Sequence, residues 1–86
     1  MLEIDRRLGR RIVQARETLQ MTPETVAAKI EVSFSDYKKI EAGSVRIRAL
    51  YMARLSRVLK QPLRWFYEGL PGQTKFEAST RLGKSV

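Results

Sequence analysis

Basic side chains are the residues of this chain with the clearest chemical potential, and they gather in its second half. The 86 residues carry 17 Lys and Arg against 9 Asp and Glu, a net charge of +8. The stretch from Ser44 to Trp65 has no acid and these bases: Arg46, Arg48, Arg54, Arg57, Lys60 and Arg64. Such a surface binds polyanions, of which nucleic acid is the commonest. The alternative is a basic face that only keeps the protein in solution.

The sequence has few residues suited to catalysis, metal binding or redox chemistry. The chain has no Cys and no His, which removes disulfides, thiol nucleophiles and the usual zinc ligands. Its carboxylates are scattered, and no glycine-rich loop is present to hold a phosphate. We therefore expect no enzyme activity, no catalytic residue, no metal site, no cofactor and no small-molecule ligand.

Nothing in the sequence indicates a membrane protein. No apolar run approaches the ~18 residues of a membrane span. The first residues, Met-Leu-Glu-Ile-Asp, lack the basic start and apolar core of a signal peptide. We expect a cytoplasmic protein that is associated with the nucleoid.

The stretch from Thr22 to Gly43 predicts two short helices joined by a tight turn. Thr22 is suited to cap the first helix, with Pro23 at the first helical position, where a missing N–H costs nothing. Apolar residues then recur at helical spacing at Val26, Ala27 and Ile30. A helix of about eight residues is not stable alone in water, so this stripe must pack on another element.

The second helix is predicted between Ser33 and Gly43. Ser33 is its N-cap, Asp36 stands in the capping-box position, and Gly43 can adopt the left-handed conformation that ends a helix. One side of this helix carries Phe34, Tyr37, Ile40 and Glu41, and the other carries Ser35, Lys38, Lys39 and Ala42. Two short helices, a tight turn and an exposed polar side form the layout of a helix-turn-helix.

These residues resemble the helix-turn-helix of the phage-repressor and Cro-like family, also called the XRE family. The matching positions are Ala27, Val32, Ile40 and the closing Glu41-Ala42-Gly43. A second set resembles the repressor-like regulators of alphaproteobacteria: Val45-Arg46-Ile47, Ala49, Leu59, Pro62 and Trp65-Phe66-Tyr67-Glu68-Gly69. The likeness runs from about Leu8 to Gly69. It implies a sequence-specific regulator, a repressor in particular, that binds double-stranded DNA.

The resemblance also implies a role for individual side chains, because the second helix of the motif lies in the major groove in this family. The residues implied to contact base edges are Phe34, Ser35 and Lys39. Lys39 is suited to donate a hydrogen bond to guanine. Contacts with the DNA backbone fall to a second set: Ser33, Lys38, Ser44, Arg46 and Arg48. A structural ion pair is implied between Arg16 and Glu41.

Some positions leave alternatives open. Phe34 either packs on a thymine methyl group or folds back between the two helices as core. Asp36 either faces the DNA, where it repels phosphate, or caps the helix, which is the interpretation we adopt. The family often has Gln where this chain has Pro23 and Gly where it has Glu31, so Glu31 is expected in a strained left-handed conformation.

Three further helices complete the predicted fold. Asp5 is suited to cap a first helix that ends at about Leu19, and its core stripe is Leu8, Ile12, Ala15 and Leu19. A fourth helix, poorly capped at Arg48, is expected from Ala49 to Lys60, with Arg54 and Arg57 on the surface. The core side of that helix is predicted to carry Ala49, Met52, Leu55 and Leu59. A fifth short helix follows from Pro62 to Glu68.

Together these elements predict an all-α, compact five-helix domain over residues 1–69, followed by a flexible tail over 70–86. At least two of Trp65, Phe66 and Tyr67 are expected in the core. The resemblance implies a homodimer formed at this end of the fold. Two alternatives to an operator-binding regulator stay open. One is a protein-interaction adaptor that reuses the fold, and the other is an antitoxin or restriction–modification controller that regulates its own gene.

Overall fold

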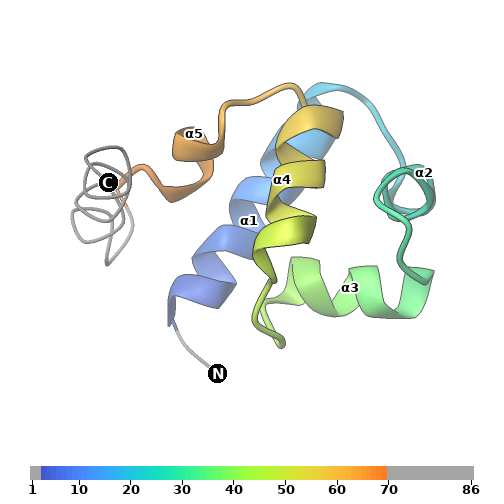
Figure 1. Ribbon diagram of the computed structural model, residues 1–86, viewed down its shortest axis with the longest axis horizontal. Helices are drawn as coiled ribbons and strands as arrows, with labels where there is room; N and C mark the ends of the chain where they lie inside the picture. The colour runs from blue at the N-terminus through green and yellow to red at the C-terminus, as the bar shows by residue number, and fades with distance from the viewer. Residues whose placement is uncertain (1–2, 70–86) are drawn as a thin grey trace, which may run out of the picture.

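The computed structural model describes residues 3–69, which fold into helices without a strand. The helices are α1 (Glu3–Thr18), α2 (Pro23–Lys29), α3 (Phe34–Ala42), α4 (Ala49–Val58) and α5 (Leu63–Tyr67) (Figure 1). The predicted all-α fold with five helices is therefore confirmed. The expected tail, residues 70–86, lies outside the described residues. Among the helices that are described, none has the length and apolar character needed to cross a membrane.

The helices enclose one hydrophobic core. α3 packs on α1 and α2 along one edge of the molecule, and α4 and α5 pack on the remaining sides of α2 and α1 (Figure 1). The buried apolar side chains are Leu8, Ile12, Ala15, Val26, Ala27, Ile30, Tyr37, Ile40, Met52, Leu55, Leu59 and Phe66. Every helix contributes at least one of them, because helices this short are stable only when packed.

The beginning of α1 differs from the prediction at Asp5. The helix starts at Glu3, so Asp5 lies inside the first turn and is only 5% exposed. Its Oδ1 lies 3.9 Å from Nε of Arg46, in the segment after α3. The predicted N-cap role of Asp5 is therefore wrong. The helix already includes Glu3, so Asp5 lies within the first turn, where its buried carboxylate pairs with a guanidinium from another part of the chain.

Two glycines allow α1 and the end of α3 to approach closely. A Cβ on Gly9 would lie 2.4 Å from the carbonyl oxygen of Glu41. A Cβ on Gly43 would lie 2.4 Å from Cα of Arg6, and Gly43 has φ 73°, as expected of the residue that ends α3. The end of α3 therefore packs directly against the backbone of α1.

The second half of the fold departs from the prediction in one core position. Ala49 is exposed, so its predicted place on the core side of α4 is wrong, whereas Met52, Leu55 and Leu59 are buried. Ala49 is the first residue of α4, and no side chain caps the helix at Arg48. At α5, Phe66 is fully buried and Trp65 packs edge-on against it, with ring centroids 5.1 Å apart.

Candidate nucleic-acid interface

The first helix of the motif begins and ends with specific polar contacts. The Oγ1 of Thr22 accepts a hydrogen bond of 3.1 Å from the backbone N–H of Thr25, and Pro23 follows at the first helical position. At the other end, Arg54 donates from Nη1 to the carbonyl oxygen of Ile30 at 3.0 Å. Arg54 was expected on the surface; its side chain is 31% exposed and joins α4 to the end of α2.

The turn between α2 and α3 has the conformation that the sequence predicts. Glu31 has φ 64°, a left-handed conformation in a residue other than Gly. The backbone N–H of Val32 then donates to the carbonyl oxygen of Ala27 at 3.1 Å, which closes the turn. The turn that links the two helices therefore contains a residue in a strained conformation.

α3 is anchored by its buried side and its two ends. The backbone N–H of Asp36 donates to Oγ of Ser33 at 3.0 Å, which caps the first turn. Tyr37 and Ile40 are buried in the core. The backbone N–H of Gly43 donates to the carbonyl oxygen of Ile40 at 3.1 Å and ends the helix. The helix is therefore held rigidly while its other side remains open.

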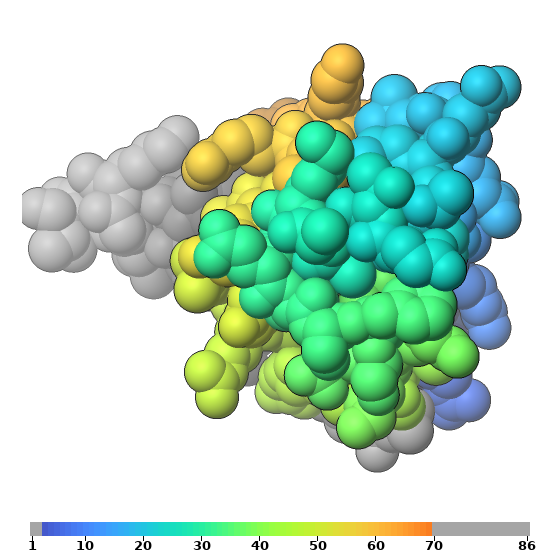
Figure 2. All heavy atoms as spheres, turned by 90° about the vertical axis from the view of Figure 1, so that its right-hand side faces the viewer, coloured from blue at the N-terminus to red at the C-terminus, as the bar shows by residue number. Residues whose placement is uncertain are grey.

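The open side, which we call the α3 face, is formed by Phe34, Ser35, Lys38, Lys39 and Ala42. All five are exposed, and together with Ser44 they line a shallow hollow on the surface. Figure 2 shows α3 in the lower part of the view, below α2. The face presents two amines, a hydroxyl and an aromatic ring, and no carboxylate.

Phe34 lies at the N-terminal end of this face and is not part of the core. Its side chain is 41% exposed, and Nζ of Lys38 lies 5.3 Å from the centre of its ring. A cation in this position is attracted to the face of an aromatic ring. The structure therefore favours the solvent-facing alternative for Phe34, in which the ring is available to an apolar group.

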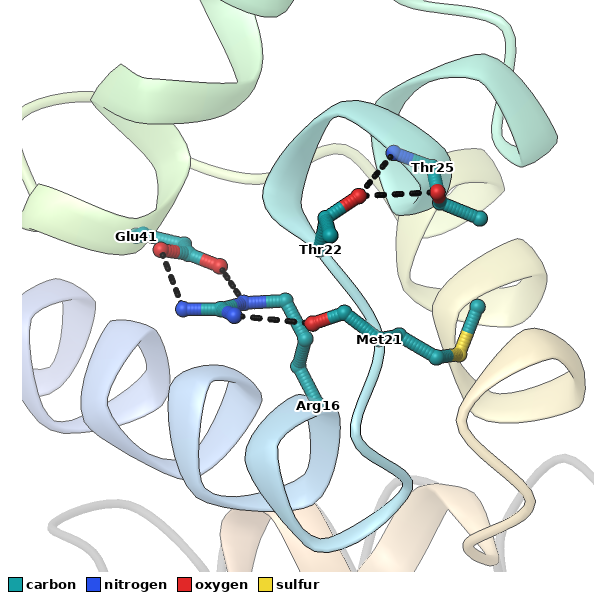
Figure 3. A network of polar contacts seen from close by, with 5 residues as sticks. All are labelled: Arg16, Met21, Thr22, Thr25 and Glu41. Atoms are coloured by element: carbon teal, nitrogen blue, oxygen red, sulfur yellow. Dashed lines mark hydrogen bonds and ion pairs between the residues drawn. The ribbon is translucent and has the colours of Figure 1, made fainter.

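An ion pair between Arg16 of α1 and Glu41 of α3 lies behind the α3 face (Figure 3). Nε of Arg16 lies 2.7 Å from Oε2 of Glu41, and Nη1 donates to the carbonyl oxygen of Met21 at 3.0 Å. The two side chains are only 12% and 16% exposed. Although burial lowers the pKa of Arg16, the hydrogen bond and charge of Glu41 raise it overall. One guanidinium thus ties together α1, α3 and the segment before α2.

Tyr37 lies in the core beside this ion pair. Its side chain is fully buried, and its hydroxyl has no hydrogen-bond partner within the described residues. Burial raises the pKa of the Tyr37 hydroxyl strongly, and the adjacent carboxylate of Glu41 raises it further. The phenol is therefore neutral at physiological pH and acts as part of the core.

The segment from Ser44 to Arg48 presents guanidinium groups next to the α3 face. Arg48 is exposed, and Arg46 is exposed although its Nε lies 3.9 Å from Asp5. Ser44 is different, because its hydroxyl donates to the carbonyl oxygen of Lys39 at 3.2 Å. That bond occupies the only proton which the side chain of Ser44 has to offer a phosphate.

Sequence reasoning missed three residues that position this site. Gly9 carries no signal in the sequence, because an isolated Gly in a predicted helix has no single meaning. Asp5 pairs with Arg46, and Arg54 donates to Ile30, so both contacts join distant segments of the chain. Local sequence patterns do not predict such contacts. Among residues 3–69, no cluster of three or more His, Cys, Asp or Glu is arranged to hold a metal ion.

Comparison with known proteins agrees with this geometry. The sequence profile of the family described as helix-turn-helix matches residues 12–66, well over half of the chain. The chain therefore belongs to this family, in the phage-repressor and Cro-like (XRE) form that its motif residues resemble. No solved structure matches the chain significantly.

Similar curated proteins come from alphaproteobacteria. An uncharacterized transcriptional regulator in the ATPase CF(0) region of Rhodospirillum rubrum is 34% identical over 67 residues, which cover 78% of this chain and 62% of the relative. An uncharacterized HTH-type transcriptional regulator of Sinorhizobium medicae is 32% identical over 69 residues, covering 80% and 50%. Another from Sinorhizobium fredii is 34% identical over 65 residues, covering 76% and 46%. The chain spans about half of the length of most of these relatives.

Proposed function

We propose that this chain is a transcriptional regulator that binds double-stranded DNA by inserting α3 into the major groove. The observation that carries the proposal is the α3 face itself. Its five residues are exposed and include no carboxylate, while Tyr37 and Ile40 of the same helix are buried in the core. Arg46 and Arg48 border the face in a hollow that they line together with Lys39 and the exposed Asp36 of α3. A rigid helix with an open polar and basic side is the element that reads base edges in helix-turn-helix proteins.

Within this interface, the proposed roles follow from position. Lys39 reads a base edge, with Ser35 beside it, and Phe34 contacts a thymine methyl group near the start of the helix. Lys38, Arg46 and Arg48 contact the DNA backbone, and Ser33 lies at the N-terminus of α3, where a phosphate is favoured. We leave Ser44 out of the phosphate contacts because its proton is already donated to Lys39.

We further propose that the chain acts as a homodimer in the cytoplasm and represses transcription by occupying an operator. Leu50 in α4 is 55% exposed and Leu63 in α5 is 37% exposed, so both side chains are available for a contact between protomers. A symmetric dimer would place two copies of α3 about 34 Å apart on one side of the duplex. Sedimentation equilibrium with and without a selected operator tests this assembly. A complex containing one protomer per duplex would contradict it.

Selection of bound sites from random duplex DNA tests the binding proposal. The selection is carried out with the wild-type chain, with Lys39→Ala and with Arg46→Ala. We expect Lys39→Ala to relax preference at one base position by ~1–3 kcal/mol, whereas Arg46→Ala weakens binding to all sequences alike. Lys29→Ala, which removes a lysine from α2 outside the α3 face, is the matched control and should leave both properties unchanged. Selection of no common sequence by the wild-type chain would refute the proposal.

A further inference from the structure

A second charged surface lies at the end of the domain away from α3. It is a groove lined by Leu19, Met21, Lys29, Arg57, Val58 and Lys60, which we call the basic groove, with a volume of about 470 Å³. Its residues come from the turn after α1, from the end of α2, and from the end of α4 and the turn that follows it. These segments meet in the upper part of Figure 2, whereas α3 occupies the lower part.

The floor of the basic groove is apolar and held in place from behind. Leu19, Met21 and Val58 are partly buried and pack against the core on one side only. The carbonyl oxygen of Met21 accepts the hydrogen bond from Arg16, and its side chain extends away from the ion pair toward α4 (Figure 3). A methionine thioether is flexible and polarisable, so it adapts to apolar groups of different shapes.

The edges of the basic groove carry three positive charges that are not neutralised. Lys29, Arg57 and Lys60 are exposed, and within residues 3–69 none of them has an ion-pair partner. In the described part of the chain, Arg16 pairs with Glu41, Arg46 with Asp5 and Arg54 with Glu31. Lys38, Lys39 and Arg48 at the α3 face resemble the groove cations in having no ion-pair partner among residues 3–69. No acidic residue lines the groove.

We propose that the basic groove binds an acidic amphipathic segment of a partner protein. Apolar side chains of that segment would lie on Leu19, Met21 and Val58, and its carboxylates would meet Lys29, Arg57 and Lys60. A nucleic-acid backbone supplies the negative charge but has no apolar side chains for the floor. The partner is also unlike this chain itself, which has a net charge of +8 and only one acid, Glu77, within residues 70–86.

This binding mode is independent of the proposed DNA interface. α4 leads away from the segment beside α3, and its ten residues span about 15 Å. Arg57 and Val58 at its far end therefore lie away from a duplex that is held at α3. Such a partner can bind while the regulator occupies DNA, which would connect the operator to another protein.

Peptide display on the full chain tests the proposal. A library of random 15-residue peptides is selected on the immobilised protein, and the enriched peptides are synthesised with a fluorescent label. We expect these peptides to combine Asp and Glu with apolar residues at helical spacing. Affinity is then measured by fluorescence anisotropy for the wild-type chain and for Lys29→Glu/Arg57→Glu. We expect this double variant to bind roughly tenfold more weakly or worse.

The control is Arg7→Glu/Arg10→Glu, which makes the same change in net charge at exposed positions of α1 outside the groove. It should retain the affinity of the wild-type chain within about twofold, and circular dichroism verifies that both variants are folded. Enrichment of peptides without acids, equal losses in the two variants, or enrichment of no peptide would overturn the proposal. A third arm measures the affinity for duplex DNA. If only the groove variant loses DNA affinity beyond the control, the groove is a nucleic-acid surface and the proposal fails.

Discussion

Tyr37 shows how a single buried side chain joins the core to the helix that carries the proposed interface. Its ring is fully buried in the core, while its hydroxyl lies near the Arg16–Glu41 ion pair without a hydrogen bond in the described chain. An unsatisfied buried hydroxyl costs about 1–3 kcal/mol relative to the same group in water. The ring, rather than the hydroxyl, is therefore what stabilises this part of the fold.

We predict that Tyr37→Phe leaves the free energy of unfolding at pH 7 unchanged or raises it by up to about 1 kcal/mol. The variant should also resist alkaline pH better than the wild-type chain. Because the pKa of Tyr37 is higher in the folded than in the unfolded chain, the unfolded chain loses its proton first. Stability contributed by this phenol is therefore complete below pH ~10 and falls as the pH rises further.

Urea denaturation at pH 7 and at pH 10.5 measures this effect. Tyr51→Phe, which removes a phenol that is only half-buried, is the control. Burial and the charge of Asp5 also raise the pKa of Tyr67. Every variant therefore keeps the part of the alkaline sensitivity that comes from Tyr67. A loss of more than about 1 kcal/mol in Tyr37→Phe at pH 7 would show that the hydroxyl makes a stabilising contact.

At the scale of elements, the close packing of α1 on α3 depends on Gly9. In an isolated helix, replacing Gly by Ala stabilises by about 1 kcal/mol. Here the added methyl group would lie 2.4 Å from a backbone oxygen of Glu41 and must push α3 away. We predict that Gly9→Ala lowers the free energy of unfolding by about 2 kcal/mol or more. Thermal and urea unfolding measure this, and a rise in stability would mean that the two helices are less closely packed.

In the turn between α2 and α3, a substitution is predicted to raise the free energy of unfolding, in contrast to Gly9→Ala. Glu31 holds a left-handed conformation that costs a residue with a Cβ about 1 kcal/mol or more, but costs Gly little. The Glu31–Arg54 pair, at 3.9 Å with an exposed carboxylate, adds little stability. We predict that Glu31→Gly raises the free energy of unfolding by about 0.5–1 kcal/mol.

Glu24→Gly is the matched control for that turn variant, because it makes the same chemical change inside α2, where φ is helical. It should lower stability by about 1 kcal/mol. Urea denaturation of both variants compares the two sites directly. Equal losses at the two positions would show that the turn does not hold Glu31 under strain.

At the scale of the whole molecule, the positive charges fall on distinct surfaces. Lys38, Lys39, Arg46 and Arg48 lie on or beside the α3 face, whereas Lys29, Arg57 and Lys60 line the basic groove. If only the first group meets DNA and Lys39 reads a base, Lys38, Arg46 and Arg48 neutralise about three phosphates per protomer. The logarithm of the binding constant should then fall with the logarithm of salt concentration with a slope near −3 for each protomer.

Titration of a selected duplex at several salt concentrations measures this slope. Arg48→Gln should reduce its magnitude by about 1, whereas Arg57→Gln should leave it unchanged. A slope near zero would contradict the proposed DNA interface. A reduction in Arg57→Gln equal to that in Arg48→Gln would mean that DNA extends from α3 to the basic groove.

The sequence by itself determined the elements of this protein and the family to which it belongs. Hydrophobic spacing, the Thr22 and Ser33 caps, Gly43 and the strained Glu31 all act within a few residues, so they can be recognised without a structure. The tertiary structure decided the rest: the inward turn of Asp5, the exposure of Phe34 and Ala49, the contact at Gly9, the occupied hydroxyl of Ser44 and the basic groove. Each of these depends on which distant segment packs next to the residue, and local sequence patterns do not contain that information.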